Sequence, residues 1–267
     1  MAGGTGGTGG TGGGTDGRDE GSGGGLSIGG SCVEASRRLA RVGAARVHRL
    51  PYRMPQSSSD EFLRPYRNAV AQHGPGFEAT LWSSRESQAL RFDVMIDLAS
   101  LAGCAVMDLG CGHGDFAARL LERGVPFRRY VGVDAIAEVI EAARGRRLER
   151  SDFVVADILE TADALAETFG AGGPPDFVCL SGTLNTMDDP HARRLVKAAF
   201  DAAAQGVVFN FLSNRPHARF AGSDTTPARR FDTAAWLDWA MGLSSRVSFT
   251  QDYLDGHDAT IMVRHEA

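Results

Sequence analysis

The stretch AVMDLGCGHGD, residues 105–115, begins with a short apolar run and ends in glycines at alternate positions, Gly110, Gly112 and Gly114. An apolar run that stops in glycines and is followed by apolar residues at helical spacing predicts a buried strand entering a helix through a tight turn. Glycine reaches positive φ cheaply and has no Cβ, so a ligand can lie directly against the backbone. The first turn of the helix adds unpaired N–H groups and a positive dipole end. We therefore expect a ligand site in this loop.

The next two apolar runs also end in aspartate. Residues 130–133 lead into Asp134, and residues 153–156 lead into Asp157. A dinucleotide fingerprint has the pattern G-x-G-x-x-G, in which the third glycine comes one residue later than it does here. No cluster of phosphate-binding cations accompanies the three aspartates. The pattern fits a nucleoside better than a pyrophosphate.

The D-x-G-x-G-x-G loop that begins at Asp108, with both downstream acids in register, resembles the class I S-adenosylmethionine-dependent methyltransferases over about residues 61–267. The resemblance implies S-adenosylmethionine as the cofactor. It assigns the methionine part to the glycine loop, the ribose hydroxyls to Asp134 and the adenine amine to Asp157. The cofactor-binding residues expected on this basis are Asp108, Gly110, Cys111, Gly112, Gly114, Asp134, Ala135, Asp157, Ile158 and Ser181. The implied fold is a seven-stranded Rossmann-like sheet, mostly parallel with an antiparallel terminal strand and helices on both faces.

Strand and helix patterns alternate after the glycine loop, which favours a parallel sheet covered on both faces. Further strands are predicted at residues 130–133, 153–155, 177–180 and 207–211. Helices are predicted at residues 117–122, 136–147, 162–169, 189–204 and 231–241, with Asp189 and Asp232 as caps. A long polar loop is expected at residues 213–230. Two terminal strands, 246–253 and 259–264, are expected to be joined by an Asp255-Gly256 turn.

Two helices are expected before the first strand. Phe62, Tyr66 and Val70 indicate the first of them. In the second, Ser83 and Glu86 form a predicted capping box. Its buried face is predicted at Leu90, Val94, Leu98 and Leu101. The start of this helix is expected to lie over the glycine loop, which makes Arg85, Gln88 and Arg91 candidates to meet the carboxylate of the cofactor.

Charge is distributed unevenly along the 267 residues, whose net charge is −5. Residues 1–30 contain sixteen glycines and are expected to be disordered, because they cannot bury enough apolar surface to fold. Residues 33–53 carry six arginines against one glutamate, and are either a segment that binds nucleic acid or membrane, or sequence upstream of a true start at Met54. The predicted domains are therefore a tail, 1–53, and a methyltransferase domain, 54–267.

Residues 54–267 hold 21 basic and 29 acidic residues, and this acidic balance disfavours a nucleic-acid substrate. The four cysteines lie far apart without a C-x-x-C pair, which indicates a reducing compartment, and we expect a cytoplasmic protein. The histidine spacing predicts no metal site. No run approaches the ~18 apolar residues of a membrane span, so no membrane partner is expected.

Acceptor chemistry is expected beyond the fourth and fifth strands, because ligands of open α/β sheets bind at the carboxyl ends of the strands. Asn185 and Asn210 lie there, and His113 of the glycine loop is a possible general base; these three are the candidate catalytic residues. The N/D-P-P-Y sequence of many amine-methylating members is missing, which lowers the odds for N-methylation of adenine, cytosine or glutamine. The loop at 213–230 is interpreted as a lid or binding loop.

The leading hypothesis is an enzyme that transfers a methyl group from S-adenosylmethionine to a small molecule. One alternative is a methyltransferase acting on RNA or protein that uses the basic segment 33–53. Two alternatives from other classes are an NAD-binding Rossmann oxidoreductase and a ligand-binding scaffold without catalysis. The oxidoreductase is disfavoured by the glycine spacing and by the absence of a Tyr-x-x-x-Lys pair.

Overall fold

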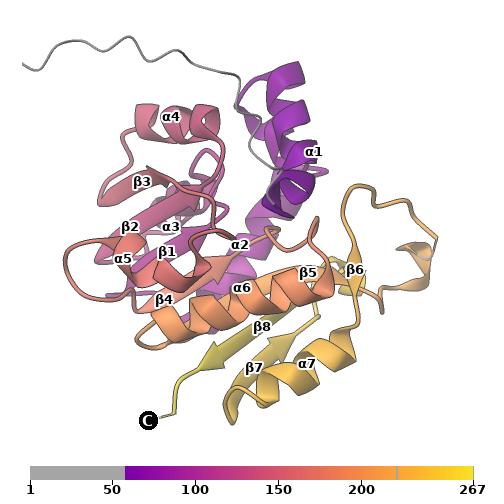
Figure 1. Cartoon of the computed structure of the whole chain (residues 1–267). Coiled ribbons are helices and arrows are strands. Elements are labelled where there is room, and N and C mark those ends of the chain that lie inside the picture. Colours follow the sequence, from indigo (N-terminus) through magenta and orange to yellow (C-terminus); the bar gives the residue numbers. More distant parts are fainter. Residues whose placement is uncertain (1–57, 221, 267) are drawn as a thin grey trace, which may run out of the picture. The chain divides into compact units, whose positions relative to one another are not determined.

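The structure is a computed structural model that describes residues 58–220 and 222–266, apart from the side chains of Ser58 and Asp163 (Figure 1). The predicted tail, 1–53, and Cys32 lie outside the described residues. The tail and the domain boundary therefore stay predictions.

A single mixed sheet forms the centre of the described chain. Its strands are β1 (Ala105–Leu109), β2 (Arg129–Asp134), β3 (Ser151–Val155), β4 (Phe177–Leu180), β5 (Gly206–Ser213), β6 (Arg230–Phe231), β7 (Arg246–Thr250) and β8 (Asp258–Arg264). The strand order is β3-β2-β1-β4-β5-β8-β7, and the short β6 pairs with the end of β5. Strands β1 to β5 are parallel, whereas β8 runs antiparallel between β5 and β7. The predicted fold class is confirmed, with β6 as an addition inside the expected loop.

Helices cover both faces of this sheet. The α-helices are α1 (Ser58–His73), α2 (Arg85–Ala99), α3 (Asp115–Glu122), α4 (Ala137–Gly145), α5 (Leu165–Phe169), α6 (Asp189–Ala202) and α7 (Thr233–Met241). Short 3-10 helices are η1 (Phe77–Thr80), η2 (Ala162–Ala164), η3 (Ala218–Phe220) and η4 (Leu254–Gly256). Helices α5, α6 and α7 contribute to one hydrophobic cluster, and α2, α3 and α4 to the other (Figure 1).

The period-two pattern of the strands explains how one sheet serves two cores. In β1, Met107 and Leu109 belong to the cluster beneath α6, whereas Val106 belongs to the cluster beneath α2 and α3. Successive side chains of a strand point to opposite faces. A parallel strand covered on both sides must therefore be apolar throughout, and all five residues of β1 are buried. Asp108 is the polar exception, and it ends up in the candidate site.

The buried face of α2 differs from the predicted one. Leu90 is 38% exposed, whereas Leu101 is buried as predicted, and Val94 and Leu98 are half-buried. The residues that face the core are Gln88, Arg91, Phe92, Met95, Ile96 and Ala99. Two of these are polar, so an apolar pattern cannot reveal this face. Arg91 is tolerated there because its guanidinium donates to both carboxylate oxygens of Asp258 on β8. The sequence of α2 contains no sign of that distant partner.

Two helix caps lie one residue away from their predicted positions. The hydroxyl of Ser84, rather than Ser83, accepts a hydrogen bond from the N–H of Ser87 at 3.1 Å. In α6, Asp188 caps the helix by accepting from the N–H of His191 at 3.0 Å, while Asp189 accepts from the Trp236 indole N–H at 2.7 Å. Neighbouring residues of the same type compete for a cap, and tertiary contacts decide between them. Asp232 caps α7 as predicted.

Replacing Arg91 with methionine should destabilise the fold strongly. Its Nε and Nη2 lie 2.7 and 2.6 Å from the two carboxylate oxygens of Asp258, and both side chains are at most 4% exposed. Removing one partner leaves a buried charge unpaired, so the free energy of unfolding should fall by ~3–5 kcal/mol in urea titrations. The matched control is Lys197→Met, which breaks an exposed pair with Asp201 and should cost ~0–1 kcal/mol. Equal losses in the two variants would contradict a structural role for the buried pair.

Candidate active site

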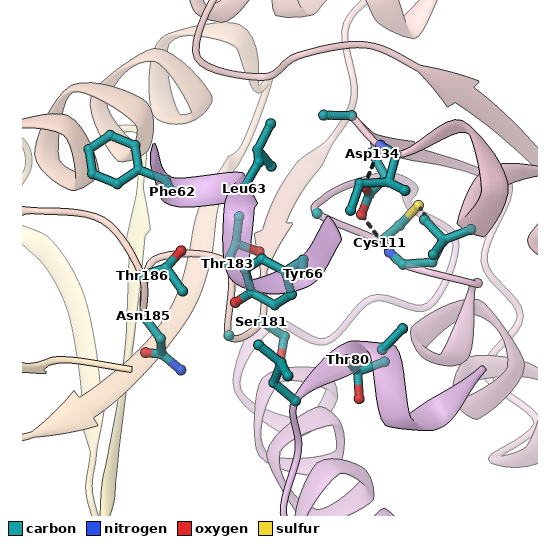
Figure 2. A pocket seen from close by; sticks show the side chains of 18 of the residues that line it. Phe62, Leu63, Tyr66, Thr80, Cys111, Asp134, Ser181, Thr183, Asn185 and Thr186 are labelled. Atoms are coloured by element: carbon teal, nitrogen blue, oxygen red, sulfur yellow. Dashed lines mark hydrogen bonds between the residues drawn. The ribbon is translucent and has the colours of Figure 1, made fainter. Parts of the chain in front are cut away.

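A pocket lies at the carboxyl ends of β1 to β4, where the loops after these strands meet helix α1, the end of the 3-10 helix η1 and the first half of α2 (Figure 2). Of the expected cofactor residues, those lining the pocket are Asp108, Gly110, Cys111, Gly112, Asp134, Ala135, Asp157, Ile158 and Ser181. Of the expected catalytic residues, His113 and Asn185 line it. Segments separated by more than a hundred residues thus meet where the parallel topology predicts a ligand site.

The glycine loop follows β1 as predicted and is shaped by close contacts. Gly110 has φ +76°, and a Cβ on it would lie 2.7 Å from Oγ1 of Thr183. The Thr183 hydroxyl in turn donates to the carbonyl of Leu109 at 2.6 Å. A Cβ on Gly112, by contrast, would meet nothing within 4 Å. The backbone at Gly112 therefore borders open space in the pocket, where a ligand can approach it.

Asp134 connects the glycine loop to the end of β2. Its Oδ2 accepts a hydrogen bond from the N–H of Gly112 at 3.0 Å, and its Oδ1 accepts from the N–H of Ile136 at 3.0 Å. Burial raises the pKa of this carboxyl, although backbone N–H groups partly offset the effect. Each carboxylate oxygen has a second lone pair, so Asp134 can still accept hydrogen bonds from a pair of hydroxyls.

Asp157 follows β3 and is held by two segments. Its Oδ1 accepts from the N–H of Leu159 at 3.0 Å, and its Oδ2 accepts from the hydroxyl of Ser59 at 2.5 Å. Ser59 lies on α1, 98 residues earlier in the chain. The first helix therefore reaches the acid expected to meet the adenine amine.

Asp108 is buried on the face of the sheet that α2 and α3 cover. Its Oδ2 accepts a hydrogen bond from the phenol of Tyr130 at 2.5 Å. Burial raises the pKa of Asp108 to about 7, despite the opposing effect of the Tyr130 hydrogen bond. A substantial fraction of Asp108 is therefore protonated at neutral pH. Its side chain lies directly beneath the start of the glycine loop.

His113 lies in the glycine loop beside the start of α3. Its Nε2 is 3.2 Å from Oδ2 of Asp115, and Arg146 donates to Oδ1 of the same carboxylate at 2.8 Å. Burial alone would raise the pKa of Asp115, but the neighbouring His113 and the hydrogen bond from Arg146 outweigh it and hold the pKa at about 2. His113 thus borders the pocket with its ring tied to a charged carboxylate, and its assignment as a base stays a prediction.

Four expected site residues do not line the pocket. The guanidinium of Arg85 lies over the ring of Phe77 at 4.4 Å, and that of Arg91 is taken by Asp258. Gln88, from the same helix, does border the pocket. Gly114 has φ +84°, and a Cβ on it would lie 2.8 Å from Phe153, so this glycine permits packing of the loop against the sheet.

Asn210 is the fourth of these residues, and it acts behind the pocket wall. Its Oδ1 accepts from the N–H of Gly182 at 2.9 Å, and its Nδ2 donates to the hydroxyl of Ser181 at 3.0 Å. It is fully buried. The geometry gives Asn210 the role of holding the loop after β4 in place, and it does not bring the amide to a substrate.

The far side of the pocket combines the loop after β4 with the loop after β5. Asn185 accepts through Oδ1 from the N–H of Leu212 at 3.4 Å, and its carbonyl accepts from the N–H of Arg229 at 2.7 Å. Thr225, Thr226, Pro227 and Ala228 line the pocket beside it. The last part of the long predicted loop therefore borders the site.

Sequence reasoning assigned α1 no part in the site, yet Ser59, Phe62, Leu63, Tyr66 and Val70 all line the pocket. Their spacing had indicated a helix with one apolar face, and no local pattern distinguishes a core face from a pocket wall. Trp82 was also missed. Its ring packs so closely on Gly182 that a Cβ there would lie 2.5 Å away. The polar residues Ser59 and Tyr66 within the apolar face of α1 were the available sign that this face lines a site.

In the part of the chain that the structure describes, no group of three or more His, Cys, Asp or Glu side chains is arranged to hold a metal ion. None of the helices described is long and apolar enough to cross a membrane.

Replacing Asp108 with asparagine should change how stability depends on pH. The folded-state pKa of about 7 lies above the ordinary value of 3.8, so the protein loses stability as pH rises through this window and the carboxyl must ionise in its buried place. Asparagine cannot ionise, and its carbonyl can still accept from Tyr130. The stability of Asp108→Asn relative to the wild type should therefore rise between pH 4.5 and 7, by up to ~1.4 kcal/mol per pH unit.

Urea titrations at several pH values measure this difference. Asp152→Asn, an exposed residue of β3, is the control and should give a profile parallel to that of the wild type. Parallel profiles for Asp108→Asn as well would mean that Asp108 is ionised throughout.

Comparison with known proteins supports the interpretation of the loop. A family model described as "Methyltransferase domain" matches residues 106–206. The ubiquinone biosynthesis O-methyltransferase of Xylella fastidiosa is 28% identical over 143 residues, which cover 51% of this chain and 56% of that protein. The chain thus matches little more than half the length of this relative.

Two solved structures share the fold. The DhpI-SAM-HEP complex aligns with a TM-score of 0.56 at 17% identity and covers 78% of this chain and 97% of that one. The small RNA methyltransferase HEN1 aligns with a TM-score of 0.54 at 14% identity, over 68% of this chain and 25% of that one. At these identities the likeness concerns the fold alone. The family model, the glycine loop and the aspartates at the strand ends agree with this fold: over residues 106–206 the chain is similar to the class I S-adenosylmethionine-dependent methyltransferases.

Proposed function

We propose that this protein transfers the methyl group of S-adenosylmethionine to a small-molecule acceptor. The observation that carries the proposal is one continuous pocket, in which the glycine loop, Asp134 and Asp157 share a cavity with the inner face of α1 and the loops after β4 and β5. One end has the groups expected for a nucleoside and the other has room for a second ligand.

The residues at the first end fit the cofactor. The bare backbone at Gly112 faces open space, and Asp134 beside it can accept the ribose hydroxyls. Asp157 has a carboxylate for an amine, and Ser59 holds that carboxylate in place. The described lining contains four aspartates and neither lysine nor arginine. This negative environment favours a ligand that carries a sulfonium and an ammonium group.

Bound S-adenosylmethionine supplies a methyl group on a sulfonium sulfur, which is a good leaving group. A lone pair of the acceptor forms the bond to the methyl carbon, the carbon–sulfur bond breaks, and its electron pair stays on the sulfur. The part left to the protein is alignment, and holding two reactants in line contributes several kcal/mol in well-oriented systems. Helix α1 and residues 225–228 line the pocket, and in the proposed reaction they hold the acceptor in place.

The lining of the pocket and the charge of the domain favour a small acceptor over a macromolecule. The HEN1 likeness means that the fold by itself does not choose between them, so the choice rests on the site. Helix α1 and residues 225–228 line one pocket together with the cofactor end, which suits a compact acceptor, and residues 54–267 carry more acidic than basic residues. The name of the Xylella relative describes a small acceptor. We also propose a cytoplasmic location, because the cysteines at 104, 111 and 179 are free and buried.

Calorimetry tests the cofactor assignment directly. S-adenosylhomocysteine and S-adenosylmethionine should bind the full chain with one-to-one stoichiometry, and NAD should produce no heat of binding. A turnover screen that detects S-adenosylhomocysteine release from pools of small molecules should then identify acceptors. Binding of NAD without S-adenosylhomocysteine would refute the proposal, and tight cofactor binding with turnover only on RNA or protein would refute the acceptor class.

Asp134→Asn should weaken the binding of S-adenosylhomocysteine. The substitution removes the negative charge from hydrogen bonds to ribose hydroxyls, which are worth ~1.5–3 kcal/mol for charged groups. The dissociation constant from calorimetry should rise by about ten- to a hundredfold. Asp152→Asn, on the neighbouring strand and exposed, should leave the constant unchanged. Unchanged affinity in a folded Asp134→Asn protein would show that another residue holds the ribose.

A further inference from the structure

The pocket has a second chamber whose walls differ in chemistry from the cofactor end. We define the acceptor chamber by three segments: Phe62, Leu63 and Tyr66 on the inner face of α1, residues 185–187 after β4, and residues 225–228 after β5. Figure 2 shows Asn185 and Thr186 on one side, Asp134 and Cys111 on the other, and Tyr66 between them. The assignment of this chamber to the acceptor rests on the proposed function.

Polar atoms in the acceptor chamber are neutral and gather around Tyr66. Its phenol interacts with the side chain of Thr186, which partly offsets the effect of burial on the Tyr66 pKa. Asn185 uses its Oδ1 to accept from the N–H of Leu212, which leaves its amide N–H groups as the donors on offer to a ligand. In Figure 2 the side chains of Asn185 and Thr186 lie beside that of Tyr66. The side chains of Phe62, Leu63 and Met187 form apolar walls around these polar groups.

No residue of the acceptor chamber carries a formal charge. Among the described residues that define it, Tyr66 is the one acid or base, and burial raises its pKa to about 12, with Asp134 adding to the rise. Tyr66 therefore remains a neutral phenol at physiological pH and can donate a hydrogen bond. An anion placed here would be desolvated without a cation to pair with, which is costly, and it would face the negative charge of Asp134.

A cationic acceptor is excluded for a different reason. A protonated amine has no lone pair with which to attack the methyl carbon, and the acceptor chamber holds no basic side chain that would remove its proton. The reacting form must therefore be neutral when it is bound.

We propose that the acceptor is an uncharged molecule with an apolar body and a hydrogen-bond-accepting oxygen, and that Tyr66 and Asn185 bind this oxygen. Helix α1 then has two functions. Ser59 donates a hydrogen bond to Asp157, the acid expected to bind the adenine amine, and Tyr66, two turns further along, binds the acceptor. The attacking atom bears a lone pair while the acceptor is still neutral. After the methyl group is transferred, the product carries a positive charge and loses a proton to solvent.

Matched probes test the charge preference without knowledge of the natural acceptor. 2-Naphthamide and 2-naphthoate share a flat apolar body and differ in charge. Their binding to the full chain is measured by saturation-transfer NMR, with and without saturating S-adenosylhomocysteine. The amide should bind at least about tenfold more tightly than the carboxylate at pH 7.5. Equal binding, tighter binding of the carboxylate, or no binding of the amide would overturn the proposal.

Two variants test the role of Tyr66. Tyr66→Phe should weaken amide binding by about three- to tenfold, because one hydrogen bond is lost, and should leave the affinity for S-adenosylhomocysteine unchanged. The control is Tyr253→Phe, which removes a phenol that is also paired with a threonine, Thr260 at 2.7 Å, but lies outside the pocket lining. It should change neither affinity.

The outcomes separate this inference from the proposed function. If Tyr66→Phe weakens S-adenosylhomocysteine instead of the amide, Tyr66 belongs to the cofactor end and the inference is wrong. If the wild type fails to bind S-adenosylhomocysteine, the proposed function is wrong, whereas the amide preference is still measured on the protein alone.

Discussion

The site depends on the carboxylate of Asp134, because it joins the turn after β2 to a loop that lies 22 residues earlier in the chain. One oxygen accepts from Gly112 in the loop after β1, and the other accepts from Ile136 in the turn after β2. Burying this carboxyl is costly, as its raised pKa indicates, and the backbone N–H groups offset part of the cost. The glycine loop and the ribose acid are therefore one structural unit, positioned before any ligand arrives.

The pocket is divided by charge. At the cofactor end, acids gather around backbone N–H groups, which suits a ligand with positive charge. In the acceptor chamber the polar groups are hydroxyls and an amide, and the walls are apolar. Helix α1 spans both ends, through Ser59 on Asp157 and Tyr66 beside Thr186. Contact of one helix with both ligand positions provides a physical route by which binding of the cofactor can organise the acceptor chamber.

A buried ion pair lies on the core-facing side of α2. Arg91 binds Asp258 of β8 on the same side as Phe92, Met95 and Ile96, while Leu90 faces outward. Apolar periodicity pointed to Leu90, Val94 and Leu98 because it assumes that charged residues face solvent. That assumption fails where a partner 167 residues away neutralises the charge. The same reasoning explains why Arg91 looked available to the cofactor and is not.

The sequence by itself determined the order of strands and helices, the glycine loop and the aspartates that follow the strands, because these depend on local periodicity, on the backbone freedom of glycine and on the common direction of parallel strands. Only the tertiary structure decided that α1 forms a wall of the pocket, that Asn210 supports the loop after β4, and that Arg91 is occupied by Asp258. Each of these facts is a contact between segments far apart in the chain. No local pattern encodes such a contact, because its free energy arises only when both partners are buried together.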